Sequence, residues 1–181
     1  PEGYSLKWGG QSESQKTANI KLSIILPITL ILIALILRLN FKKWRYVGVA
    51  MSSIVVTLSG CIFALFLTRT YFSISAGVGF IAAIGVSIQN GVILLSALIR
   101  QHGKHQDKDL AIINGSVEKL RPVLCASTVA ILGLLPAALS NGIGAQSQKP
   151  FAIAIIGGLF VGTTFTIFLI PVLFRKTVHS K

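Results

Sequence analysis

The chain has 181 residues, of which 52% are hydrophobic and only 12% are charged, and its formal net charge is +12. The charged share is about half that of an ordinary soluble domain, which argues against a soluble globular protein. The positive charges are divided among short segments, so they do not form the single basic patch expected of a nucleic-acid-binding domain.

Five stretches without Asp, Glu, Lys or Arg separate these charged segments. They lie at 22–37, 46–68, 70–99, 122–148 and 150–174. Because about 20 mostly apolar residues cross the hydrocarbon core of a bilayer, each stretch predicts one membrane-spanning helix. The first is short, but Lys21 and Arg38 at its ends can reach the two interfaces and complete it. The predicted fold is an all-α membrane protein with a five-helix transmembrane bundle.

The predicted elements follow one another with short connections. Residues 1–18 are a polar segment, 19–174 form the bundle and 175–181 form a tail; within the bundle the spans are expected at about 19–39, 46–67, 75–99, 123–140 and 151–174. In the longest loop, 100–121, four apolar residues recur at helical spacing: Leu110, Ile113, Val117 and Leu120. This spacing predicts a short amphipathic helix lying along the cytoplasmic membrane surface.

The Lys and Arg residues are distributed unequally when alternate loops are assigned to opposite sides. One side receives twelve of them and the other side, which includes Lys7, Lys16, Lys21, Arg69 and Lys149, receives five. The positive-inside rule therefore predicts that the N-terminal segment lies outside and the C-terminal tail lies in the cytoplasm. An odd number of spans requires the same result.

Small residues recur at four-residue spacing in two of the spans. Ala83, Ser87 and Gly91 form one ridge on the third span, and Gly158 and Gly162 form a GxxxG pair on the fifth. Such ridges let two helices approach closely. We therefore expect these residues to lie at helix–helix contacts.

The most polar residues inside the predicted spans are Gln89 and Asn90, near the middle of the third span. Buried amides need hydrogen-bond partners, so both are expected to face the bundle interior. They could line a proton relay or a water-filled path, or they could form a hydrogen bond that only holds the helices together. The sequence does not favour either interpretation. No Asp, Glu, His, Lys or Arg, the usual groups of proton-coupled transport, lies well inside a span.

Hydroxyl residues in the last two spans are weaker candidates for the same relay. They are Ser127 and Thr128 in the fourth span, and Thr163, Thr164 and Thr166 in the fifth. Such hydroxyls usually bond to carbonyls of their own helix, so a structural role is the more common one.

No metal site, cofactor or enzyme active site is predicted. His102 and His105 provide two ligands without a third. Cys61 and Cys125 are placed at different depths in the membrane, which does not fit a disulfide. Phosphate-binding loops, nucleophile elbows and zinc motifs do not occur in the sequence.

Short motifs are spread in order along nearly the whole chain. They are Gly3-Tyr4, Trp8-Gly9-Gly10-Gln11, Glu13, Ser75-Ala76-Gly77-Val78-Gly79-Phe80-Ile81, Asn90-Gly91-Val92, Leu120-Arg121-Pro122-Val123-Leu124, Gly133-Leu134-Leu135-Pro136, Gly142-Ile143-Gly144-Ala145, Ile156-Gly157-Gly158 and Ile170-Pro171-Val172. In this order they resemble the C-terminal membrane segment of the heavy-metal efflux branch of the resistance–nodulation–division (RND) transporter superfamily.

The resemblance implies that the chain supplies helices eight to twelve of a longer permease, with residues 1–18 at the junction to a periplasmic porter domain. Such a permease is a proton antiporter of the bacterial inner membrane that exports metal cations. It works as a homotrimer with a periplasmic adaptor and an outer-membrane channel. The missing N-terminal half would hold the proton-loading aspartates, and Gln89 and Asn90 would pack opposite its fourth helix.

Departures from the family pattern bear on the substrate. The silver/copper branch has Glu at the Gln89 position and Lys at the Val123 position, whereas Asn90 fits the cobalt–zinc–cadmium resistance type. A Thr common in the family is Ala126 here, and a Glu in the last outer loop is Gln146. These differences favour divalent cations as cargo and leave open a relay with altered or lost activity.

Two other hypotheses compete with a transporter segment. One is a truncated or split scaffold that does not transport and only packs with partner helices. The other is a related protein-export membrane component, against which the motif Trp8-Gly9-Gly10-Gln11 argues.

Overall fold

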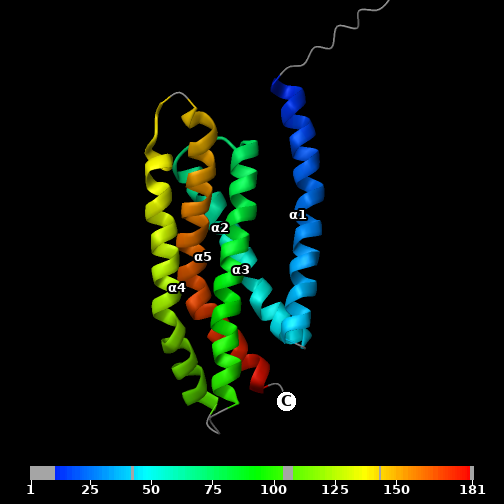
Figure 1. Cartoon of the computed structure of the whole chain (residues 1–181), viewed down its shortest axis with the longest axis vertical. Helices are drawn as coiled ribbons and strands as arrows, with labels where there is room; N and C mark the ends of the chain where they lie inside the picture. The colour runs from blue at the N-terminus through cyan, green and yellow to red at the C-terminus, as the bar shows by residue number, and fades with distance from the viewer. Residues whose placement is uncertain (1–10, 42, 104–107, 143, 180–181) are drawn as a thin grey trace, which may run out of the picture.

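The structure is a computed structural model, which describes residues 11–41, 43–103, 108–142 and 144–179 (Figure 1). Five helices follow one another: α1 (Gln11–Phe41), α2 (Trp44–Leu67), α3 (Ile74–His102), α4 (Lys108–Leu139) and α5 (Ala145–His179). Each contains a segment long and apolar enough to cross a membrane. The predicted five-helix all-α membrane bundle is confirmed.

The helices run up and down, so their connections gather at two ends (Figure 1). We call the end with the α2–α3 and α4–α5 connections the Lys149 end, and the opposite end the Arg100 end. At the Lys149 end the Ser73 hydroxyl accepts a hydrogen bond from the Ala76 amide at 3.3 Å and caps α3. Helix α5 extends to His179, so most of the predicted tail continues the last helix.

Helix α5 lies at the centre of the bundle and contacts α2, α3 and α4. Helix α1 contacts only α2 and α3 and stands apart from the other four helices (Figure 1). Among the side chains described in α1 only Leu37 is buried, and most of its Ile and Leu side chains are exposed. Its apolar surface therefore faces outward, as expected for a helix in contact with lipid or with further helices.

The core at the Arg100 end is filled by large apolar side chains. Leu94, Leu95 and Leu98 of α3 pack with Ile170 and Phe174 of α5 in one cluster. The ring of Phe174 also stacks on Tyr46, with the two centroids 5.8 Å apart. Burial of these side chains is the main source of stability for this half of the bundle as it packs helix on helix.

From the middle of the bundle toward the Lys149 end, small residues bring the helices together. A Cβ atom added at Gly158 would lie 2.5 Å from the Cys61 sulfur and 2.9 Å from the Ala83 Cβ. One added at Gly162 would lie 2.6 Å from the Thr57 hydroxyl oxygen, and one at Gly91 would lie 3.1 Å from the Ile170 side chain. The predicted ridges thus lie where α2, α3 and α5 touch.

The amphipathic segment after α3 differs from the prediction. It is helical but it is not a separate surface helix, because residues 108–121 are continuous with the fourth span. Pro122 lies inside α4 and removes only one backbone donor, which a helix can tolerate at the cost of a bend. The small residues Ala111 and Gly115 are buried, with Gly115 against Leu98, while the predicted apolar row is exposed on another face.

Candidate polar relay

A chain of hydrogen bonds joins three helices inside the bundle. The Asn90 side-chain amide of α3 donates to the Ser127 hydroxyl of α4 at 3.0 Å. The Ser127 hydroxyl lies 2.7 Å from the Thr163 hydroxyl of α5, and either group could be the donor. All three side chains are at most 5% exposed. Buried amides and hydroxyls require such partners, which explains why they meet at this point.

A second pair of hydroxyls connects α2 to α3 beside this chain. The Thr57 hydroxyl lies 2.6 Å from that of Ser87 and 2.8 Å from the Ser53 carbonyl oxygen. Ser87 lies one helical turn from Asn90, and Gly162, which touches Thr57, precedes Thr163. We call Thr57, Ser87, Asn90, Ser127 and Thr163 the polar layer; it links α2, α3, α4 and α5.

The buried hydroxyl of Thr166, one turn beyond Thr163, has no hydrogen-bond partner among the described residues. This residue is 1% exposed. A buried hydroxyl without a partner is unfavourable by about 1–3 kcal/mol. The position is therefore a place where water or a group outside this chain could extend the polar layer.

Gln89 and Thr128 do not join the layer, although each is adjacent to one of its members. Both are exposed, whereas Asn90 and Ser127 are 3% exposed. The expectation that both amides face the interior of these helices is wrong for Gln89. Successive residues on a helix point about 100° apart, so Gln89 and Thr128 point away from the directions in which Asn90 and Ser127 form their hydrogen bond.

From the sequence, the Thr163 hydroxyl was expected to bond to a carbonyl of its own helix. In the structure it pairs with the Ser127 hydroxyl of α4 instead. Thr164 behaves as expected and donates to the Phe160 carbonyl oxygen at 2.7 Å. The signal that could have identified Thr163 is its position directly after Gly162, on the face of α5 that approaches Thr57. Small and polar residues that share one helix face indicate a close polar contact.

The polar layer contains amides and hydroxyls only, so it has no group that ionises near neutral pH. It can hold four helices in register, and the Ser127–Thr163 pair can reverse its hydrogen-bond direction. A proton-driven cycle would therefore need its acid from outside these residues. The chemistry of the polar layer is therefore better suited to transmitting a movement between helices than to binding and releasing a proton.

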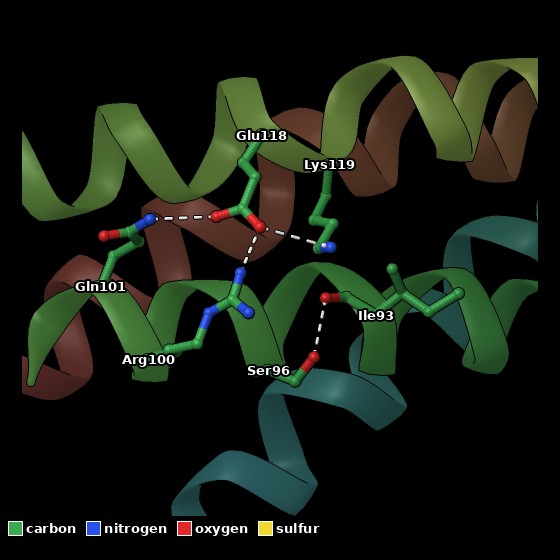
Figure 2. A network of polar contacts seen from close by, with 6 residues as sticks. All are labelled: Ile93, Ser96, Arg100, Gln101, Glu118 and Lys119. Carbon is green, nitrogen blue, oxygen red and sulfur yellow. Dashed lines mark hydrogen bonds and ion pairs between the residues drawn. The ribbon is translucent and has the colours of Figure 1, made fainter.

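A different polar network lies at the Arg100 end (Figure 2). Glu118 of α4 forms ion pairs with Arg100 and Lys119 and accepts a hydrogen bond from the Gln101 amide at 2.9 Å. The network joins the end of α3 to the first part of α4 and helps to explain why residues 108–121 follow α3 closely. Arg175 forms a similar link from α5 to Asp109, at 3.2 Å.

We expect Glu118→Gln to leave the thermal unfolding midpoint of the complete protein essentially unchanged. Half-exposed ion pairs gain little, since water and salt screen both charges. Differential scanning fluorimetry in detergent tests this, with Arg175→Gln as a second exposed ion-pair variant. A clear fall of the midpoint in Glu118→Gln alone would contradict the assignment of a surface role.

The structure offers no metal centre among the residues that it describes: nowhere do three or more His, Cys, Asp or Glu side chains gather. His102 lies with its ring 6.0 Å from that of Phe174, while His105 lies outside the described residues. Cys61 and Cys125 are both free, and only Cys61 is buried.

An α-helical bundle with small-residue contacts and buried hydrogen bonds between its helices has the packing expected of a multi-pass membrane protein. A model of the AcrB/AcrD/AcrF family matches residues 1–178. The chain therefore belongs to this family, and within it to the heavy-metal efflux branch of the RND superfamily, as the sequence motifs predict. It is a multi-pass protein of the inner membrane.

Relatives of this branch cover nearly the whole chain. The nickel and cobalt resistance protein CnrA of Cupriavidus metallidurans is 40% identical over 173 residues, 96% of this chain and 16% of that protein. The cobalt-zinc-cadmium resistance protein CzcA of the same organism is 36% identical over 181 residues, covering 100% and 17%. The cation efflux system protein CusA of Escherichia coli is 31% identical over 184 residues, covering 96% and 18%.

A solved structure shares the fold. The crystal structure of a heavy metal efflux pump superposes with a TM-score of 0.84 and 34% identity, over 100% of this chain and 18% of that pump. The chain thus spans less than a fifth of the length of the relatives it matches. Their names are those of metal-resistance and cation-efflux proteins, which favours the metal-efflux prediction over the protein-export alternative.

Proposed function

We propose that this chain is the C-terminal membrane portion, helices eight to twelve, of a proton-driven permease that exports divalent heavy-metal cations. Its N-terminus lies in the periplasm and its C-terminus in the cytoplasm. The chain works with the N-terminal half of the permease in a homotrimer, together with a periplasmic adaptor and an outer-membrane channel. Identities of 36–40% to nickel, cobalt, zinc and cadmium resistance proteins support a divalent cargo.

The observation that carries the mechanism is the hydrogen-bonded chain Asn90–Ser127–Thr163. Gln89 is exposed on α3. In the proposed permease its neutral amide faces a helix of the N-terminal half. When an acid on that helix gains or loses a proton, its hydrogen bonding to Gln89 changes and α3 shifts. Asn90, which points about 100° around the helix from Gln89, passes the shift through Ser127 and Thr163 to α4 and α5. Coupling of this kind needs an element with two discrete arrangements, which a chain with a reversible hydroxyl pair can provide.

We expect Gln89→Ala/Asn90→Ala in the complete permease to lower metal/proton antiport by about tenfold, within the usual range for coupling between two sites. The assay is uptake of Co²⁺ or Zn²⁺ and release of protons in proteoliposomes. The matched control is Ser59→Ala/Ser96→Ala, two exposed hydroxyls that bond to their own helices at 2.7 and 2.9 Å. Unchanged antiport in the amide variant would overturn the proposed role.

A further inference from the structure

An apolar groove runs along the Lys149 end of the bundle. Its floor is α5 and its walls are α2 and α4, which do not contact each other. The volume of the groove is about 720 Å³, within the usual range of small-molecule sites. Its lining includes five large apolar side chains: Phe63 and Leu67 of α2, Leu135 and Leu139 of α4, and Phe160 of α5. Gly60 of α2 and Gly157 of α5, which are in close contact, also line the groove and carry no side chain that could fill it.

A single cation lies at this groove. Lys149 is the only Asp, Glu, Lys or Arg between Arg121 and Arg175, and it lines the groove together with Asn141. Its ammonium group donates to the side-chain amide oxygen (Oδ1) of Asn141 at 2.9 Å. That bond uses one of three ammonium hydrogens, and no Asp or Glu of the described residues forms an ion pair with this group. Among the described residues that line the groove there is no Asp or Glu.

The position of the groove restricts what can occupy it. Its walls belong to segments apolar enough to span the membrane, so the surrounding medium is the bilayer. Lys149 bonds to Asn141, which lies just beyond Leu139, the residue at which α4 and its apolar segment end. An occupant therefore needs an apolar chain for the walls and an anionic group for the ammonium, at the level of the lipid headgroups.

We propose that the groove is a binding site for a bilayer phospholipid with a net anionic headgroup. One acyl chain lies between Phe63 and Leu67 of α2 and Leu135 and Leu139 of α4. The headgroup phosphate accepts hydrogen bonds from the Lys149 ammonium and the Asn141 amide. Lys at a membrane surface attracts anionic lipid, and the aromatic and aliphatic walls hold the chain. This inference is independent of the cargo and of the proton coupling proposed above.

The test is photo-crosslinking in the complete permease, reconstituted in nanodiscs with phosphatidylglycerol that carries a diazirine on one acyl chain. Mass spectrometry maps the labelled residues, and the same experiment with diazirine phosphatidylcholine gives the lipid preference. We expect labelling at 63–67 and 135–139, with the phosphatidylglycerol label preferred. Lys149→Gln should lower the phosphatidylglycerol labelling about fivefold, the effect of one cation at a membrane surface.

Two variants complete the design. Arg69→Gln removes another cation at the same end, which lines a different pocket, and should leave the groove labelling within about twofold because the charge attraction is local. Ala138→Trp fills the groove and should reduce labelling by both lipids. Equal phosphatidylglycerol labelling of Lys149→Gln and of the unmodified permease would overturn the proposal. Equal labelling of the unmodified permease by the two lipids would also overturn it. An unlabelled groove would also overturn it, since another part of the permease would then cover the groove.

Discussion

Replacing Ser127 by alanine in the complete permease is expected to lower both its stability and the metal/proton antiport that we propose for it. Ser127 is the middle of the polar layer, so its loss leaves the Asn90 amide and the Thr163 hydroxyl without their shared partner. Buried polar groups without partners cost about 1–3 kcal/mol, and hydrogen bonds between membrane helices measure toward the lower end. Unfolding in SDS gives the free energy, and antiport in proteoliposomes should fall about tenfold.

A variant in which all three residues of the chain are apolar can distinguish a structural role of this chain from a role in coupling. In Asn90→Leu/Ser127→Ala/Thr163→Val no member of the chain is left unsatisfied, and such replacements are often nearly neutral for stability. We expect stability to recover most of the loss seen in Ser127→Ala. If the layer transmits the movement of α3, antiport per folded permease stays low. If the layer only holds the bundle, antiport recovers together with stability.

The control for this series is Thr164→Val, whose hydroxyl is exposed and bonds to its own helix. We expect it to change neither quantity. Full antiport in the all-apolar variant would contradict coupling through Asn90, Ser127 and Thr163 and would favour the structural interpretation.

The second large effect is expected from Gly157→Ala. A Cβ atom at this position would overlap the Cβ of Ala64 and lie 2.9 Å from the Gly60 carbonyl oxygen. Backbones that touch in this way cannot separate without disturbing the neighbouring contacts of α2 and α5. Overpacking of this kind costs about 1–3 kcal/mol. The measurement is again the free energy of SDS unfolding of the complete permease.

A double variant tests whether the overlap with Ala64 is the cause. Ala64→Gly removes the clashing methyl group, so Ala64→Gly/Gly157→Ala should be more stable than the sum of the single variants predicts. Gly133→Ala is the matched control, because nothing lies within 4 Å of its Cβ position. It should be neutral or stabilising by up to about 1 kcal/mol, through helix propensity. If the effects of the two single variants simply add, the destabilisation comes from another contact, for example the one with the Gly60 carbonyl oxygen.

The number and type of the elements could be predicted because hydropathy and charge belong to each segment by itself. A stretch such as 70–99 has no charged residue and can only cross the bilayer as a helix, where all backbone groups are satisfied internally. The continuity of α4 through Pro122 could not be predicted in this way. It depends on Ala111 and Gly115 fitting inside the bundle, with Gly115 against Leu98, and this contact becomes visible only when two helices are placed together.

The candidate site was predicted in part. Asn90 and Ser127 were identified as polar residues of the spans, but the sequence did not indicate that they bond to each other or that Thr163 completes the chain. Pairings between residues 36 and 37 positions apart depend on the rotation of each helix about its axis. That rotation is set by the packing of all neighbours at once.

By itself, the sequence determined that this protein is a bundle of membrane-spanning helices, that small residues mark its contacts, and to which transporter branch it belongs. Only the tertiary structure decided which side of each helix is buried. Asn90 faces α4 while Gln89 faces outward, and the ridge glycines on α5 face α2 and α3. The physical reason is that membrane insertion depends on the composition of a segment, whereas a buried hydrogen bond depends on how separate segments are rotated against one another.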